Sequence, residues 1–176
     1  GQWRFPAADS LPDKFVDCLL TYEDKRFFYH PGIDPAAIVR AIRLNGKAGR
    51  VVSGGSTLTM QLARIARGNQ DRTFYEKTIE MCWALFLETT YSKQEILNLY
   101  ASHAPFGGNV IGLETAAWRY FGRSASELSW AESATLAVLP NSPALIHPGR
   151  NRKQLKEKRD RLLASLQKKG ILEETE

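Results

Sequence analysis

Apolar side chains recur at helical spacing along almost the whole chain, and this periodicity restricts the fold more than any other feature of the sequence. Residues 16–27 and 72–91 repeat apolar positions at i, i+3, i+4 and i+7, the spacing of one helix face. Residues 50–53 are the one candidate for a strand. Further helical stretches occupy residues 35–45, 56–64, 96–100, 113–120, 130–139 and 151–169. The sequence therefore predicts a mainly α fold.

Several helix boundaries carry recognisable chemical signals. Residues 10–13 resemble a capped helix start with a proline near the first turn. Residues 30–32, His-Pro-Gly, are expected to end that helix, because a residue before proline avoids the helical region. Ser92 and Glu95 match a capping box, and residues 129–132 are expected to start a further helix.

The bulk composition fits one folded domain. With 176 residues, of which 43% are hydrophobic and 24% charged, the chain can bury a core and is not expected to be disordered. It has no run of about 18 apolar residues that could span a bilayer. Its first residues also lack the charged-then-apolar pattern of a signal peptide. An anchor or export segment is therefore expected outside this chain.

Cysteine and histidine usage argues against a disulfide framework or a histidine metal site. Cys18 and Cys82 both lie in apolar helical patterns, where a free thiol behaves as a small hydrophobic side chain. We therefore expect two buried, unpaired thiols. His30, His103 and His147 share no ligand spacing, so no metal site is predicted from them.

The net charge of +5 comes from one segment. Residues 150–169 hold nine Lys or Arg side chains, against only Glu157 and Asp160. Over the remaining residues, acidic groups outnumber basic groups by 17 to 15. Either this segment is a solvated helix face or it is attracted to an anionic surface.

Glu23 is a candidate general base. It lies on the stripe that residues 16–27 turn toward the core, whereas Asp24 and Lys25 are expected on the polar side. A buried carboxylate either has a partner or has a raised pKa, and a raised pKa suits a base that works near neutral pH. A structural Glu, paired with Arg26 or capped by a nearby amide, is the plainer interpretation.

Glu80 is a second candidate carboxylate, beside the apolar face of residues 72–91. That face consists of Ile79, Cys82, Trp83, Phe86 and Leu87. Glu76 and Glu88 compete with Glu80 for the same role on periodicity alone. Two carboxylates that face one cleft would resemble the acid/base pair of glycoside chemistry, while an ordinary solvated Glu is the alternative.

Residues 54–57, Gly-Gly-Ser-Thr, precede a predicted helix and could present backbone N–H groups to a phosphate. They lack the lysine and spacing of a nucleotide-binding P-loop. Arg64, Arg72 and Lys77 follow closely, and together they could neutralise a diphosphate. The alternative is an ordinary Ser or Thr helix cap after a flexible loop.

Four motifs in order identify one family by resemblance. Residues 23–32, EDKRFFYHPG, resemble the E-D-x-x-F-x-x-H-x-G motif of glycosyltransferase family 51. Residues 55–61, GSTLTMQ, resemble the family's G-x-S-T-x-T-Q-Q motif. Residues 72–80 fit R-T-x-x-R-K-x-x-E, and residues 93–97 fit K-x-E-I-L. The similarity extends over residues 15–148, a length at which chance agreement is negligible.

The chain also departs from the family pattern. Met60 replaces the first Gln of the second motif, and Glu76 replaces the Arg that precedes Lys77. Residues 101–103, Ala-Ser-His, stand where the family often has Leu-Asn. Met60 and the Ala-Pro-Phe-Gly-Gly sequence of residues 104–108 are most similar to class A penicillin-binding proteins of the 1C type.

The resemblance implies a single domain over residues 1–176, with a lysozyme-like helical head and a small jaw subdomain at residues 33–60 that touches the membrane. It implies an enzyme at the outer, periplasmic face of the bacterial inner membrane, acting on lipid II and a growing glycan strand. It further implies a C-terminal transpeptidase domain in the full-length protein. No cofactor is certain, although the resemblance leaves room for a divalent cation such as Mg²⁺, and no nucleic-acid partner is expected.

The resemblance also implies roles for particular residues. Glu23 would deprotonate the acceptor sugar's 4-hydroxyl for attack on the donor's anomeric carbon, with inversion and departure of the lipid diphosphate. Glu80 would assist at the diphosphate, where cations stabilise the leaving charge. The positions that match substrate-binding residues of the family are Asp24, Ser56, Thr57, Gln61, Arg64, Arg72 and Lys77.

Two other functions compete with this interpretation. The same carboxylates on a lysozyme-like core would suit a glycan-cleaving enzyme, although the clustered cations argue against it. Residues 150–169 would suit an anionic-polymer or nucleic-acid binder, whose affinity would fall steeply with salt. No set of aromatic side chains that could stack on bases accompanies that segment.

Overall fold

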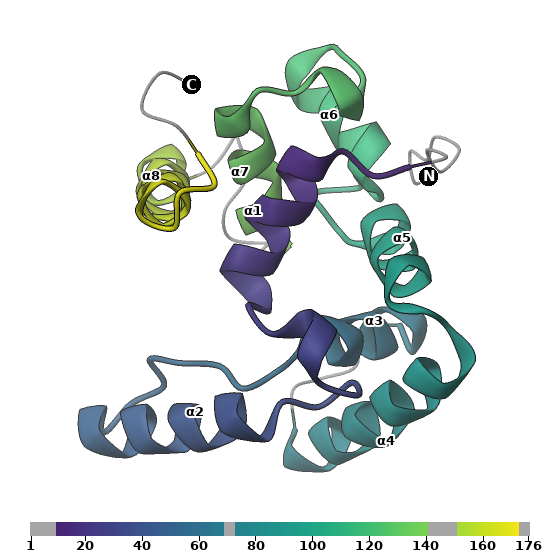
Figure 1. Ribbon diagram of the computed structural model, residues 1–176, viewed down its shortest axis with the longest axis vertical. Helices are drawn as coiled ribbons and strands as arrows, with labels where there is room; N and C mark the ends of the chain where they lie inside the picture. Colours follow the sequence, from purple (N-terminus) through teal and green to yellow (C-terminus); the bar gives the residue numbers. More distant parts are fainter. Residues whose placement is uncertain (1–9, 69–72, 141–150, 173–176) are drawn as a thin grey trace. The chain divides into compact units, whose positions relative to one another are not determined.

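The computed structural model describes residues 10–68, 73–140 and 151–172, which form eight α-helices and two short 3-10 helices (Figure 1). Among these residues the only β pairing is an isolated bridge between Pro105 and Ile111. The prediction of a mainly α fold is confirmed. No helix in this part of the chain combines the length and the apolar character needed to cross a membrane.

Residues 50–53, the one candidate for a strand, do not form one. This stretch follows α2 (Pro35–Ala48) and has no strand partner. Instead, the Asn45 amide bonds its backbone: Oδ1 accepts from the N–H groups of Val52 and Ser53 at 2.8 and 2.9 Å, and Nδ2 donates to the Ser53 carbonyl. An Asn side chain therefore satisfies polar groups that a neighbouring strand would otherwise bond.

The chain divides into two compact units, Arg26–Ile96 and a unit made of Gly1–Lys25 with Leu97–Glu176. We call the latter the first unit and Arg26–Ile96 the second unit. The predicted jaw at residues 33–60 falls within the second unit, and its role as a jaw stays a prediction.

The first unit is built around α1 (Asp13–Glu23), which packs against α7 (Trp130–Val138) and α8 (Arg152–Lys168). Its core includes Phe15, whose ring centroid lies 6.4 Å from that of Phe106. Most of α7 is buried because its small Ala, Ser and Thr residues let neighbouring helices approach closely. This unit also holds α6 (Leu113–Phe121), the 3-10 helix at Ala125–Glu127 and most of α5 (Lys93–His103).

The expected end of the first helix, at residues 30–32, is wrong. Helix α1 ends at Glu23, and Asp24 leaves the helical region with φ −153° and ψ 78°. The Asp24 N–H still bonds the Leu20 carbonyl, which closes the last turn. A separate 3-10 turn, Phe27–Tyr29, then precedes the His-Pro-Gly sequence.

The second unit contains α2, α3 (Leu58–Ala66) and α4 (Phe74–Thr90), and α3 packs along α4. Asp34 caps α2 by accepting a hydrogen bond from the Ala37 N–H at 3.0 Å. Gly32 has φ +84°, and a Cβ there would meet the Ala84 carbonyl oxygen at 2.7 Å. Glycine is therefore required where this loop crosses α4.

The apolar face predicted on α4 is largely exposed. Cys82, Trp83 and Phe86 are exposed, the last two by 45% and 58%, whereas Glu80 and Ala84 are buried. The reason is the polar surface that α3 turns toward α4. The two helices are joined by Thr59 with Glu88, Arg64 with Glu80 and, at the end of α3, Arg67 with Glu76.

Candidate functional site

Glu23 occupies the last turn of α1 in the first unit and is half-buried. Burial raises the pKa of the neighbouring Tyr22 to about 12, and the negative charge of Glu23 adds to that shift. Asp24, which was expected on the polar side, is buried instead. The helix ends at Glu23, so the helical periodicity that would have turned Asp24 outward no longer applies.

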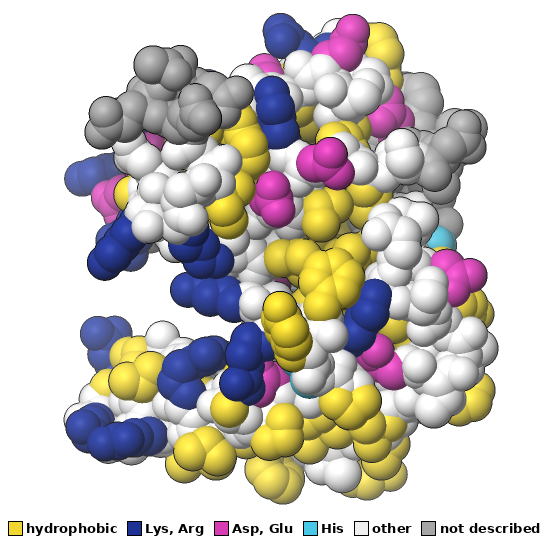
Figure 2. Space-filling model, viewed as in Figure 1, with side chains coloured by type: hydrophobic (Ala, Val, Ile, Leu, Met, Phe, Trp, Pro, Cys, Tyr) yellow, Lys and Arg dark blue, Asp and Glu magenta, His cyan; other side chains and the backbone are white. Residues whose placement is uncertain are grey.

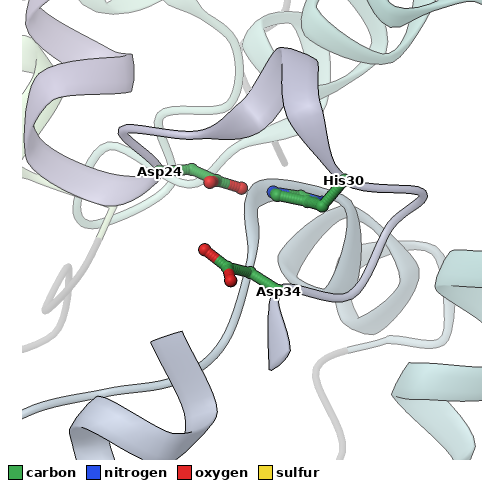
Figure 3. Close-up of side chains that lie close together, drawn as sticks. All are labelled: Asp24, His30 and Asp34. Carbon is green, nitrogen blue, oxygen red and sulfur yellow. The ribbon is translucent and has the colours of Figure 1, made fainter. Parts of the chain in front are cut away.

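Asp34 and His30 are buried in the second unit, on the segment that leads into α2 (Figure 3). Arg26 binds Asp34 through two of its nitrogens, with Nε 3.0 Å from Oδ2. The hydrogen bond from Arg26 is the main reason that the pKa of Asp34 falls to about 2. A carboxylate that also caps α2 has little capacity left for a metal ion, so we assign Asp34 a structural role.

The carboxylates of α4 point toward α3 and each has a cation nearby. Arg64 Nη1 lies 3.9 Å from Glu80 Oε1, and both side chains are largely buried. Glu88 accepts from Lys93 Nζ at 2.7 Å and from Thr59 Oγ1 at the same distance. The Glu76 that departs from the family pattern pairs with Arg67.

Lys77 lies one turn before Glu80 on α4 and is half-buried. Helical spacing of three residues places Lys77 and Glu80 on neighbouring positions of one face. Arg72 falls outside the residues that the structure describes. Within the second unit, the structure therefore brings Arg64 and Glu80 together and sets Lys77 on the adjacent turn.

Thr57 serves as the N-cap of α3. Its Oγ1 accepts from the Met60 N–H at 3.2 Å and donates to the Gly32 carbonyl at 2.5 Å. The alternative of an ordinary helix cap is thus confirmed for Thr57, whereas Ser56, before it, is half-buried. Gln61 is buried on the next turn, and Met60 is fully buried, so an apolar side chain suits the position where the family pattern has Gln.

Two lysines near these carboxylates were not singled out by sequence reasoning. Lys93 Nζ donates to the His30 carbonyl at 2.7 Å, binds Glu88 and lies 4.4 Å from the centroid of the Phe27 ring. Lys158 of α8 lies near enough to Glu23 for the carboxylate to influence it. The K-x-E-I-L motif carried a signal for Lys93, but Lys158 was hidden among the many basic residues of its helix.

Comparison with known proteins places these features in a family context. A family model described as "Transglycosylase" matches residues 2–167. Penicillin-binding protein 1C of Escherichia coli (strain K12) is 40% identical over 172 residues, which cover 97% of this chain and 22% of that protein. Penicillin-binding protein 1A of Aquifex aeolicus (strain VF5) is 37% identical over 168 residues, covering 96% and 23%. The chain thus spans less than a quarter of the length of these relatives.

Proposed function

Because the chain belongs to the transglycosylase family, we propose that it is a peptidoglycan glycosyltransferase, which polymerises lipid II into glycan strands. The family match over residues 2–167 carries this proposal, since it includes all four motifs and both candidate carboxylates. The similarity to penicillin-binding proteins of several bacteria supports the same activity.

Glu23 is the proposed general base. Its carboxylate takes the proton of the acceptor sugar's 4-hydroxyl, and the oxygen forms a bond to the donor's anomeric carbon with inversion. The bond from that carbon to the lipid diphosphate breaks, and its electron pair leaves with the diphosphate. The half-buried place of Glu23 at a helix end supports this role, because a base needs both partial desolvation and access to substrate.

Arg64, Lys77 and Arg72 are the proposed partners of the leaving diphosphate. Positive charge near a developing anion stabilises the transition state most where water is partly excluded. The largely buried pair of Arg64 and Glu80 supports this assignment. Glu80 would fix the orientation of the guanidinium, while Ser56, Gln61 and Asp24 would contact the rest of the substrate.

The test is polymerisation of labelled lipid II by the Glu23→Gln variant. We expect loss of polymer with an unchanged melting temperature, because the amide keeps the shape of the side chain but cannot accept the proton. Glu157→Gln, an exposed carboxylate on α8, is the matched control and should polymerise normally. Full polymerisation by Glu23→Gln would contradict the assignment, and release of soluble muropeptides from purified wall would favour the glycan-cleaving alternative.

The second unit is proposed to bind the membrane surface through α2 and the following loop. Val39 and Ile42 of α2 are 64% and 67% exposed, and Val51 and Val52 of the loop are exposed as well. Figure 2 shows Lys and Arg side chains gathered over α2 beside hydrophobic ones. Apolar groups flanked by basic ones suit an interface with anionic lipid.

Vesicle sedimentation with and without anionic lipid tests this surface. A variant with both Val39→Ser and Ile42→Ser should bind vesicles more weakly, whereas Trp118→Ala, an exposed apolar residue of α6, should not. Equal binding by the two variants would contradict the proposal. We propose that the protein acts at the outer face of the bacterial inner membrane. We also propose that the full-length protein has a membrane anchor and a transpeptidase domain. Labelled penicillin would detect the transpeptidase domain.

A further inference from the structure

Helix α4 carries its charged side chains on one side only. Because successive residues are turned by about 100°, the charged residues occupy about 120° of the helix circumference, and they are Glu76, Lys77, Glu80 and Glu88. The three glutamates contact α3 and the residue that follows it. We call the rest of the surface of Phe74–Thr90, apart from Ala84 and Leu87, the outer arc of α4. The outer arc covers about 200° and contains no Asp, Glu, Lys or Arg.

The outer arc exposes several large apolar side chains. Phe74 and Tyr75 are 90% and 72% exposed, and Trp83, Leu85 and Phe86 are exposed as well. The Trp83 and Phe86 rings contact each other edge to face, with their centroids 5.9 Å apart. Scattered exposed apolar residues are ordinary, but an apolar surface that follows one helix from end to end marks a contact with a partner or a membrane.

The threonines of the outer arc satisfy their hydroxyl groups within the helix. Thr78 Oγ1 donates to the Phe74 carbonyl at 3.2 Å. Thr89 and Thr90 both donate to the Phe86 carbonyl, at 2.7 and 3.1 Å. A threonine bonded in this way does not need water to accept its proton. The outer arc therefore presents no charge, and its threonine protons need no acceptor from outside the helix.

Helix α8, which also has 17 residues, shows the arrangement that is usual for a helix in water. It buries Leu155, Leu162 and Leu166 and exposes charged residues such as Lys153 and Glu157. Apolar residues inside and charged residues outside are the pattern of a helix at a water-facing surface. Helix α4 has the reverse pattern, so an apolar medium suits its outer arc better than water does.

A lipid bilayer fits the outer arc better than a protein partner. Protein interfaces form about one hydrogen bond per 100–200 Å² and have a polar rim, and the outer arc offers few groups for either. The bilayer core requires no such groups, and Trp and Tyr rings suit its boundary. Figure 2 shows hydrophobic side chains along the lower edge of the second unit, over α2 and α4. The outer arc thus continues the membrane-binding surface proposed for α2.

We propose that the outer arc of α4 is a second membrane-binding surface, which lies flat in the bilayer and contacts acyl chains without any need for anionic lipid. This inference rests on the proposed action of the second unit at a membrane. The two surfaces differ in what drives their binding. Helix α2 exposes Arg40 and Arg43 beside its apolar groups, so anionic headgroups attract it. Burial of apolar area alone drives the contact of α4, and this contact should therefore resist salt.

The exposed thiol of Cys82, near the middle of the outer arc, allows a direct test. Cys18 is buried, so an environment-sensitive fluorophore can be attached to Cys82 in the native protein. With vesicles of phosphatidylcholine alone, we expect its emission to shift to the blue and to be quenched by spin-labelled acyl chains. The response should persist at about 0.5 M salt, which screens exposed charges. A variant with Cys82→Ser and Lys156→Cys carries the label on the exposed side of α8 and should show neither change.

Sedimentation of the unlabelled chain with the same vesicles provides a second measurement. The combined variant Trp83→Ser and Phe86→Ser should bind phosphatidylcholine vesicles about tenfold more weakly, because two aromatic rings leave the contact. Its melting temperature should stay the same, since both side chains are exposed. The matched variant Arg40→Gln and Arg43→Gln should keep its binding to these vesicles and lose only the additional binding that anionic lipid provides.

The outcomes separate this inference from the proposed role of α2. Absence of the blue shift and of quenching with phosphatidylcholine overturns the inference, even if the chain binds anionic vesicles. A blue shift that appears without vesicles and grows with protein concentration also overturns it, because a second copy of the chain would then cover α4. If the label responds to phosphatidylcholine but anionic lipid adds no binding, the proposed role of α2 fails and that of α4 stands.

Discussion

Helices α1 and α4 each carry one of the two candidate carboxylates, but they orient their apolar faces in opposite ways. Helix α1 buries its apolar face, including Phe15 and Leu19, and leaves Glu23 half-buried at its end. Helix α4 instead buries Glu80 and exposes Trp83 and Phe86. Figure 2 shows hydrophobic side chains on the surface of the second unit.

The contrast teaches that the packing partner decides which face of a helix is turned inward. Helix α7 offers α1 small and apolar side chains, so burial of apolar area drives their contact. Helix α3 turns Thr59 and Arg64 toward α4. These two side chains contact carboxylates of α4, so α4 buries its carboxylates at this contact. Buried ion pairs add little stability over an apolar contact of the same size.

Truncation of one aromatic residue in each helix is the most direct test of this difference between α1 and α4. Phe15→Ala should lower the free energy of unfolding by about 3–5 kcal/mol, because it opens a cavity in a packed core. Phe86→Ala should change it by less than about 1 kcal/mol, since this ring is mostly in water. Amide hydrogen exchange in α1 and α4 measures each effect locally. A large loss of protection in α4 for Phe86→Ala would show that its outer face is packed.

Replacing Glu88 tests whether the inward carboxylates of α4 hold α3 in place. Glu88→Gln leaves Lys93 without its carboxylate and weakens the bond from Thr59. We expect a loss of about 2 kcal/mol, which is less than for a fully buried pair because Lys93 is partly exposed. The amide exchange rates of α3 and α4 should rise accordingly. The control variant Glu157→Gln, at an exposed position, should change these rates little. Unchanged protection in Glu88→Gln would mean that this contact is dispensable.

Sequence reasoning found the helices well because their signals are local. Ser92 and Glu95 form the predicted capping box at the start of α5, with Glu95 Oε2 2.7 Å from the Ser92 N–H. Residues 129–132 start α7 as predicted, and Ser129 and Glu132 form a capping box there. Each of these signals depends on a few neighbouring residues, so no knowledge of tertiary contacts is needed.

The failures concern tertiary contacts. Periodicity identified an apolar face on α4, but it could not reveal that α3 would meet the helix on the opposite side, beside Glu80. It could not predict that the Asn45 side chain would accept hydrogen bonds from the backbone of the strand candidate at residues 50–53. For the site, residue chemistry supplied Glu23 and Glu80 only as candidates, and the motifs supplied their proposed roles.

The buried carboxylate of Asp34 should make the stability of the second unit depend on pH. Its pKa falls from 3.8 to about 2, chiefly through the hydrogen bond from Arg26. A lowered pKa contributes stability above pH 4, and this contribution is lost as the pH falls toward 2. Asp34→Asn keeps a capping side chain but removes the charge. It should therefore cost about 1–2 kcal/mol at pH 7, after allowance for the half-exposed Arg26.

Urea denaturation at several pH values measures this difference. The gap between wild type and Asp34→Asn should be constant from pH 7 to about 5 and should close progressively below pH 4. Asp160→Asn, on the exposed side of α8, serves as the control and should show a gap near zero throughout. A gap for Asp34→Asn that widens at low pH would reverse the sign and contradict the assignment.

The smallest expected effect is a difference in reactivity between the two thiols. Two buried cysteines were expected, but only Cys18, on the inner face of α1, is buried, whereas Cys82 lies on the outer face of α4. Burial raises the pKa of Cys18 from 9.0 to about 12, so at pH 8 it has about a thousandfold less thiolate than an ordinary thiol.

A thiol reagent should therefore label one cysteine in the native protein and two after denaturation. Cys82→Ser should remove the fast phase without changing stability, and Cys18→Ser should leave that phase intact. Equal labelling of both thiols in the native protein would mean that α1 and α4 do not differ in the way described.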